Sequence, residues 1–206
     1  MTVRKTTNIL IVGVGGQGNR TLMKLIASAA LEAHEDVRVL SSTSLGRLGG
    51  PITCHIRIGS AVSATIPTGE ADILVALEMN EALRALPMMR RGALAFIYTY
   101  CRLPLIAGVN GMHYPSIDEI TKVSMDKGIT GIFVPEFLSS SEGHVAEQGQ
   151  YSVSANIIML GILCGYTGFF PRSCVEQSLC QCFPECAVQN GRALAIGWQY
   201  GKKLRE

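Results

Sequence analysis

Short runs of apolar residues alternate along this chain with longer stretches in which apolar residues return at helical spacing. The first run covers residues 8–12 and is followed by four glycines within residues 13–18. Leu22, Leu25 and Ile26 come next, three and four positions apart, which places them on one face of a helix. The pattern predicts a strand, a glycine turn and a helix in direct succession.

The same alternation continues to the end of the chain and predicts further elements. Strands are expected at residues 37–40, 52–58, 73–77, 93–98 and 129–134, with an edge hairpin at 61–66 and an irregular excursion over 103–112. Helices are expected at residues 80–89, 117–127, 154–164, 174–182 and 187–204. Because strands and helices alternate without a repeat or a linker, we expect one domain over residues 1–206. Its predicted class is α/β, with a single doubly wound, mostly parallel, Rossmann-like sheet and a helical C-terminal part.

The glycine turn is the first candidate binding site. Gly13, Gly15 and Gly18 have the spacing G-x-G-x-x-G, and Gly16 and Gln17 lie between them. Glycine allows the backbone to take positive φ and to approach a ligand closely, while the free N–H groups of the following helix attract an anion. The turn therefore indicates a phosphate site, although tight packing of strand on helix without a ligand explains the same glycines equally well.

The residues at the end of the second predicted strand indicate which of two kinds of phosphate ligand is expected. A nicotinamide-binding domain usually places Asp or Glu there to hold the ribose hydroxyl groups. In this chain Ser41 and Ser42 occupy that position, and Glu32, Glu35 and Asp36 precede the strand instead. The sequence therefore argues against a stand-alone dinucleotide-dependent oxidoreductase and favours another phosphate ligand.

Two charged residues are further candidates near that edge of the sheet. Arg47 lies in the loop after the second strand, where its guanidinium is expected either to meet an anion or to contact a partner. Glu78 ends an apolar strand, so its carboxylate is expected over the edge near the glycine turn. The alternative interpretation is that Glu78 caps the helix starting near Asn80, where the positive end of the helix dipole favours a carboxylate.

Composition limits the functional classes. Hydrophobic residues make up 48% of the 206 residues and charged residues only 17%, which indicates that a partner covers part of the surface. The net charge is +2 without an extended basic block, so we expect no nucleic-acid partner. No apolar stretch is long enough to span a membrane, and no membrane association is expected. Seven cysteines without a secretion signal are typical of a reduced, cytoplasmic protein.

The cysteines and histidines predict no metal centre and no nucleophilic active site. Cys174, Cys180, Cys182 and Cys186 follow the spacing C-x5-C-x-C-x3-C, which is neither that of structural zinc nor that of ferredoxin clusters. We therefore expect buried or half-buried thiols that pack as small apolar groups. The four histidines are scattered and are expected to face solvent or to be satisfied in the core. No catalytic residue is assigned.

Several of these stretches together resemble the gamma subunit or gamma domain of the 2-oxoacid:ferredoxin oxidoreductases, most nearly the small subunit of the indolepyruvate enzymes. The matching segments run in family order over nearly the whole chain: NILIVGVGGQG at residues 8–18, GGPITCHIRIG at 49–59, IPTGEADILVALEMNEALRALP at 66–87, SANIIMLGIL at 154–163, and Asn190, Ala193 and Gly197. Residues 43–50 read TSLGRLGG where relatives often have HGMAQRGG, so Leu48 replaces an arginine and Arg47 stands one position earlier. This departure, and Ser41 where relatives often carry an acid, leave the substrate open.

The resemblance implies a division of labour. In similar enzymes thiamine diphosphate and iron–sulfur clusters, held mainly by partner subunits, carry out the oxidative decarboxylation of a 2-oxoacid, while electrons pass to ferredoxin and coenzyme A takes the acyl group. It therefore implies a hetero-oligomer with a large thiamine diphosphate and iron–sulfur subunit, without which this chain is inactive. No cofactor is expected to be tightly bound in this chain, and coenzyme A is the ligand implied for a site formed by Gly13, Gly15, Gly16, Gln17, Gly18, Ser41, Ser42, Arg47 and Glu78. The alternative is a non-catalytic module that braces a thiamine enzyme partner without binding a ligand.

Overall fold

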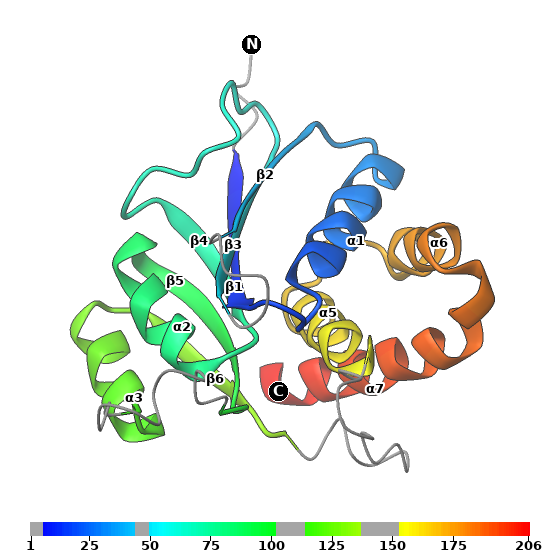
Figure 1. Cartoon of the computed structure of the whole chain (residues 1–206). Helices are drawn as coiled ribbons and strands as arrows, with labels where there is room; N and C mark the ends of the chain where they lie inside the picture. Colours follow the sequence, from blue (N-terminus) through cyan, green and yellow to red (C-terminus); the bar gives the residue numbers. More distant parts are fainter. Residues whose placement is uncertain (1–5, 44–49, 102–113, 137–152) are drawn as a thin grey trace.

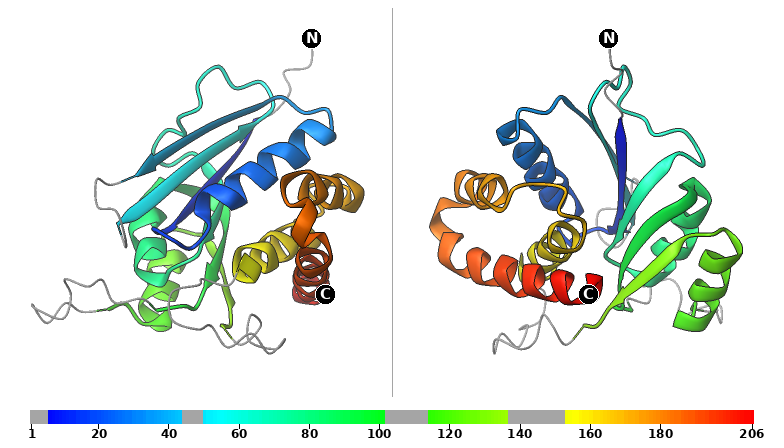
Figure 2. Two further views of the ribbon diagram at one scale, coloured as in Figure 1. Left: turned by 45° about the vertical axis from the view of Figure 1, so that its right-hand side comes forward. Right: turned by 180° about the vertical axis from the view of Figure 1, so that it is seen from behind.

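The computed structural model describes residues 6–43, 50–101, 114–136 and 153–206, and every structural statement below refers to these ranges. A six-stranded sheet lies between two layers of helices (Figure 1; Figure 2). The expected α/β class with a helical C-terminal part is confirmed. Arg47 and the excursion expected at residues 103–112 lie outside the described residues.

The sheet is mixed but mostly parallel. Its strands are β1 (Thr7–Val14), β2 (Val37–Thr43), β3 (Pro51–Ile58), β4 (Ala71–Ala76), β5 (Met89–Tyr98) and β6 (Thr130–Val134), in the order β2-β3-β1-β4-β5-β6. β3 runs antiparallel to both of its neighbours, whereas β1, β4, β5 and β6 are parallel. The carboxyl ends of β1, β2, β4 and β5 therefore share one edge of the sheet, where β3 begins.

The helices form two unequal layers (Figure 1). One layer contains α1 (Asn19–Glu32), α5 (Val153–Thr167), α6 (Arg172–Cys182) and α7 (Ala187–Arg205), and the other contains α2 (Met79–Ala85) and α3 (Ile117–Asp126), with short 3-10 turns at Leu86–Met88 and Pro184–Cys186. In β1, Ile9 and Ile11 pack toward the larger layer, while Leu10 and Val12 pack toward α2. No helix within the described ranges is both long and apolar enough to cross a membrane.

Glycines bring α5 and α7 into backbone contact. A Cβ on Gly197 would lie 2.1 Å from the carbonyl oxygen of Ile158, and one on Gly161 would lie 2.4 Å from that of Leu194. Neither position can carry a side chain at this separation of the helices. This packing explains why α5 is apolar on nearly every side, because α7 covers the side that faces away from the sheet.

The segment expected as an edge hairpin, residues 61–66, is a loop, so that prediction is wrong. Its polar backbone groups bond to side chains of β3 instead of to a strand. The Arg57 guanidinium donates to the carbonyl oxygens of Ser63 and Thr65 at 3.2 Å each. The Ile66 N–H donates to His55 Nδ1 at 3.2 Å. The alternating pattern at 61–66 therefore reflects the burial of single apolar side chains, not strand pairing.

Candidate functional site

The carboxyl ends of β1 and β4 form the switch point of the sheet. The chain leaves β1 through α1, which covers one face, and leaves β4 through α2, which covers the other (Figure 1). Ligands of open α/β sheets bind outside the strand ends at such a point. The glycine turn and Glu78 directly follow these two strands, and the Leu77 N–H donates to the Val12 carbonyl oxygen at 2.9 Å. The fold thus brings two of the predicted site segments together.

The side chain of Gln17 fills the inner side of the glycine turn. Its Oε1 accepts from the Val14 N–H at 2.8 Å, and its Nε2 donates to the Leu77 carbonyl oxygen at 2.7 Å. A Cβ on Gly13 would lie 2.6 Å from Asn19 Oδ1 and 2.7 Å from Gln17 Oε1, so a side chain at position 13 would displace these two amide groups. Gly16, at the apex, is exposed and has a φ of 97°. The apex is therefore the part of the turn that a ligand can reach.

The N-terminal ends of α1 and α5 meet behind the turn. Gly18 precedes α1 with a φ of 79°, and no side chain caps this helix. Asn156, in the first turns of α5, donates from Nδ2 to the Gly18 carbonyl oxygen at 3.3 Å. A Cβ on Gly18 would lie 2.2 Å from the same Nδ2. Uncapped N–H groups and the positive end of the helix dipole favour an anion at the start of α1.

Ser41 and Ser42 do not neighbour the glycine turn, because β3 separates β2 from β1. In nicotinamide-binding domains an acidic residue is expected at the end of the second strand, but here that strand, β2, is not adjacent to β1. Arg20, in the first turn of α1, spans this gap and places its Nε 3.3 Å from Ser41 Oγ. Arg20 was not among the site residues predicted from the sequence. Its position in the turn after the last glycine was the available signal, because a side chain there projects from the helix start.

Glu78 caps α2, as the alternative interpretation of this residue predicted. Its Oε2 accepts from the Glu81 N–H at 2.8 Å, and its Oε1 accepts from the Tyr114 hydroxyl group. The side chain is buried, so the carboxylate does not project freely over the edge. Burial raises the pKa of the exposed Cys101 thiol, and the carboxylates of Glu78 and Glu136 raise it further. This corner of the site is therefore acidic and keeps the thiol protonated.

Burial also tunes two groups beside the site. It raises the pKa of the Cys54 thiol, while a hydrogen bond to Ser41 and the charge of Arg20 act in the opposite direction. Burial raises the pKa of Glu81 too, and the Arg84 guanidinium, 3.0 Å from its Oε1, counteracts the rise. The raised pKa keeps the Cys54 thiol protonated, so its surroundings do not turn it into a nucleophile.

The cysteine prediction is wrong in part. Cys174 is half-buried, but Cys180, Cys182 and Cys186 are exposed. The reason is that α6 packs through other residues of its length, with Val175, Ser178 and Leu179 buried. The structure groups no three or more His, Cys, Asp or Glu side chains of the described ranges in a way that could hold a metal ion. His55 is a satisfied core histidine, as expected, while His113 and His144 lie outside those ranges.

Comparison with known proteins gives consistent results. The family described as pyruvate ferredoxin/flavodoxin oxidoreductase matches residues 8–200. The chain is 31% identical to the indolepyruvate oxidoreductase subunit IorB of Archaeoglobus fulgidus over 93% of both chains. Its fold is similar to that of the gamma subunit of the keto/oxoacid ferredoxin oxidoreductase from Geobacter sulfurreducens, with a TM-score of 0.67, 17% identity, and 96% and 99% of the two chains covered.

A further solved structure shares the fold as one part of a longer chain. It is the 2-oxoglutarate:ferredoxin oxidoreductase from Magnetococcus marinus with 2-oxoglutarate, coenzyme A and succinyl-CoA bound. The TM-score is 0.68 at 17% identity, and the match covers 98% of this chain and 31% of that one. The family match over nearly the full length, together with the curated relative, shows that the chain belongs to the pyruvate ferredoxin/flavodoxin oxidoreductase family.

Proposed function

We propose that this chain is the small, non-thiamine-binding subunit of a cytoplasmic 2-oxoacid:ferredoxin oxidoreductase of the indolepyruvate type. The observation that carries the proposal is the 31% identity to an indolepyruvate oxidoreductase subunit along almost the whole of both chains. The substrate is an aryl or branched 2-oxoacid, which the complex converts to an acyl-CoA. The chain is inactive without a large partner subunit that holds thiamine diphosphate and iron–sulfur clusters.

The chemistry of carbonyl attack, decarboxylation and electron transfer to ferredoxin belongs to the partner's cofactors. The role left to this chain is to hold the acyl acceptor, coenzyme A, by a phosphate group. The exposed Gly16 apex and the uncapped N–H groups of α1 suit that role, because both favour negative charge. The Arg20 guanidinium, which comes from the first turn of α1, adds a positive charge at this end of the helix. Ser41 adds a hydroxyl group at the far side of Arg20, and Ser42 and Arg47 belong to the same proposal.

The phosphate role is tested by kinetics of the reconstituted complex. Gly15→Trp and Arg20→Glu should each raise the KM for coenzyme A about tenfold or more, because a side chain obstructs the turn or a carboxylate repels the phosphate. The value of kcat at saturating coenzyme A should change little. Gly191→Ala is the matched control, since a Cβ there meets nothing within 4 Å. An unchanged KM in both variants would remove coenzyme A from this site.

A non-catalytic bracing role is the second candidate, and the hydrogen bonds of the turn favour it. The Gly15 N–H donates to the Gly50 carbonyl oxygen at 2.9 Å, and the Val14 N–H already has Gln17 as its acceptor. These two backbone N–H groups of the turn thus have hydrogen-bond acceptors without a ligand. Under this alternative, calorimetric titration of the complex with coenzyme A gives the same affinity for the wild-type and Arg20→Glu chains, and loss of the small subunit lowers only kcat.

A further inference from the structure

The edge strand β2 has only one of the features that usually protect the end of a sheet, the charged side chain of Arg38. It pairs with β3 in an unbroken register from Val37 to Thr43, and no strand lies beyond it in the described chain. Edge strands are normally shortened, bulged, covered, or occupied by lysine or proline, because their free N–H and C=O groups recruit other chains. β2 has seven residues, no bulge and no proline. It is therefore an edge open to pairing.

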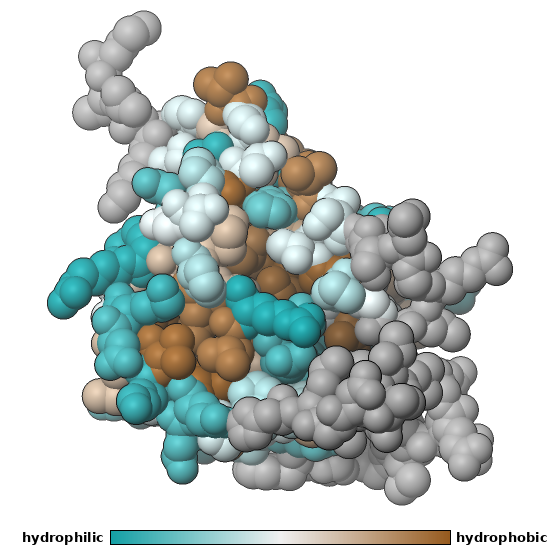
Figure 3. Space-filling view, turned by 60° about the vertical axis from the view of Figure 1, so that its left-hand side comes forward, coloured by the Kyte–Doolittle hydropathy of each residue, from teal (hydrophilic) through white to brown (hydrophobic). Residues whose placement is uncertain are grey.

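One face of β2 is also left uncovered by the helices. α2 packs on β1, β4 and β5, and α3 packs on β6, so this layer stops short of β2. Leu40, which lies opposite His55 on this face, is 42% exposed. The space-filling view from the side of α2 and α3 shows apolar residues at the surface among hydrophilic ones (Figure 3). Single exposed leucines are normal on protein surfaces, so it is the unpaired edge beside Leu40 that distinguishes this face.

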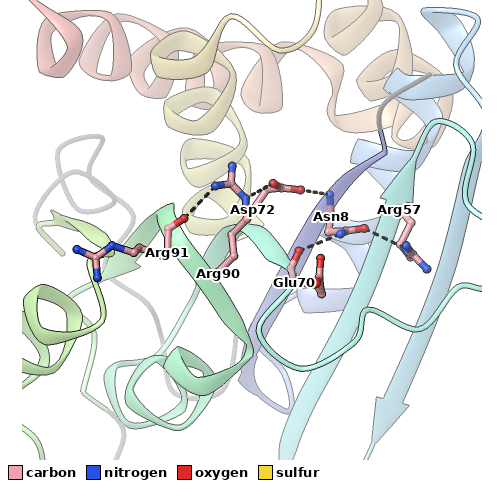
Figure 4. Close-up of polar contacts among 6 residues, drawn as sticks. All are labelled: Asn8, Arg57, Glu70, Asp72, Arg90 and Arg91. Atoms are coloured by element: carbon pink, nitrogen blue, oxygen red, sulfur yellow. Dashed lines mark hydrogen bonds and ion pairs between the residues drawn. The ribbon is translucent and has the colours of Figure 1, made fainter. Parts of the chain in front are cut away.

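Two arginines occupy directly paired positions on the same face. Arg38 and Arg57 are directly paired residues of β2 and β3, so their side chains leave the sheet side by side. Arg57 turns toward neutral acceptors, and its Nε lies 2.9 Å from Asn8 Oδ1 (Figure 4). Its guanidinium also donates to the carbonyl oxygens of Ser63 and Thr65. None of the ion pairs found within the described ranges includes Arg38 or Arg57. Like charges directly opposite each other destabilise a sheet, and no carboxylate of the described ranges forms an ion pair with either arginine here.

The neighbouring polar network contrasts with this pair. Asp72 accepts from the Asn8 N–H at 2.7 Å and pairs with Arg90, whose Nε lies 2.5 Å from its Oδ1 (Figure 4). Asn8 also donates from Nδ2 to the Glu70 carbonyl oxygen at 2.9 Å. The carboxylate of Asp72 is thus engaged at β1 and β5, away from Arg38. Arg38, which is exposed on β2, has no ion-pair partner among the described residues.

We propose that β2 docks an extended, acidic segment of the large partner subunit, which adds a strand to the sheet and places carboxylates against Arg38 and Arg57. An apolar side chain of the segment covers Leu40. A second copy of this chain does not fit, because the β2 sequence VRVLSST has no carboxylate and would bring more guanidinium groups to the same face. The proposal rests on the proposed function for the existence of a large subunit, but not on any role for coenzyme A.

The test measures binding of the full-length chain to the purified large subunit by calorimetry. Arg38→Glu and Leu40→Asp should each raise the Kd at least tenfold, and the wild-type Kd should rise with salt more steeply than that of Arg38→Gln. Arg192→Glu, an exposed charge reversal on α7, is the control and should leave the Kd unchanged. Arg38→Glu should not melt below the wild-type chain, because it places a carboxylate beside Arg57.

Hydrogen exchange supplies a second readout. The N–H groups of residues 37–43 that do not bond to β3 should exchange readily in the free chain and become protected in the complex. Unchanged exchange there, an unchanged Kd for Arg38→Glu, or an equal effect of Arg192→Glu would overturn the proposal. The proposal would also be overturned if the wild-type chain alone formed a dimer and Arg38→Glu abolished or strengthened that dimer. If the complex assembles and turns over while the β2 variants bind normally, the docking surface is wrong and the proposed function stands.

Discussion

Several side chains of this protein form hydrogen bonds with backbone groups of segments that are distant in sequence. Gln17 links the glycine turn to the end of β4, Arg57 holds the loop after β3, and His55 accepts the Ile66 N–H within that loop. Such contacts leave no periodic signal in a sequence. They explain why the elements could be predicted but the path of residues 61–66 could not.

His55 should make stability depend on pH. Burial lowers its pKa below the usual 6.5, so the folded chain holds the neutral imidazole that accepts the Ile66 N–H. The unfolded chain therefore takes up a proton first as pH falls, and stability should decline from about pH 6.5 downward until the folded-state pKa is passed. Urea unfolding between pH 5 and 8, a range set about the usual imidazole pKa, measures this decline.

The His55→Phe variant isolates that contribution. Its free energy of unfolding at pH 8 should be about 1–3 kcal/mol lower than that of the wild-type chain, because the buried Ile66 N–H is left without an acceptor. Its stability should also be less sensitive to pH between 5 and 7 than that of the wild-type chain, in the range where an imidazole titrates. An equal pH dependence in both proteins would show that other groups cause it.

At the scale of elements, local pattern predicted most strands and helices to within a few residues. Periodicity encodes which face of an element is buried, and that is what places strands such as β1 and helices such as α7. It does not encode which strand pairs with which, so the position of β3 between β1 and β2 was not foreseen. The separation of Ser41 from the glycine turn, and the importance of Arg20, follow from that pairing alone.

The contact between α5 and α7 gives a prediction at this scale. Gly197→Ala should destabilise the fold by about 1–3 kcal/mol, because its Cβ would lie 2.1 Å from the Ile158 carbonyl oxygen and force the helices apart. Gly191→Ala in the same helix meets no atom within 4 Å and should instead stabilise by up to about 1 kcal/mol. Chemical denaturation of both variants measures the difference. Similar values for the two would mean that the helices are not held by backbone contact.

The whole molecule has two features that concern partners at different places. The glycine turn, with Gly16, the start of α1 and Arg20, is the place proposed for a phosphate of coenzyme A. The β2 edge, with Arg38 and Leu40, suits an acidic strand of another chain. Low charge content and chain-long similarity to a subunit agree with a protein that works in an assembly. The variants proposed for the two places should therefore act independently, one set on the KM for coenzyme A and the other on assembly.

The most direct measurement is reconstitution with the large subunit, followed by ferredoxin reduction with indolepyruvate at varied coenzyme A. The account predicts no turnover by this chain alone, turnover by the complex, and a KM for coenzyme A that Arg20→Glu raises at unchanged kcat. Turnover by the isolated chain, or an equal KM for the large subunit with and without it, would contradict the account.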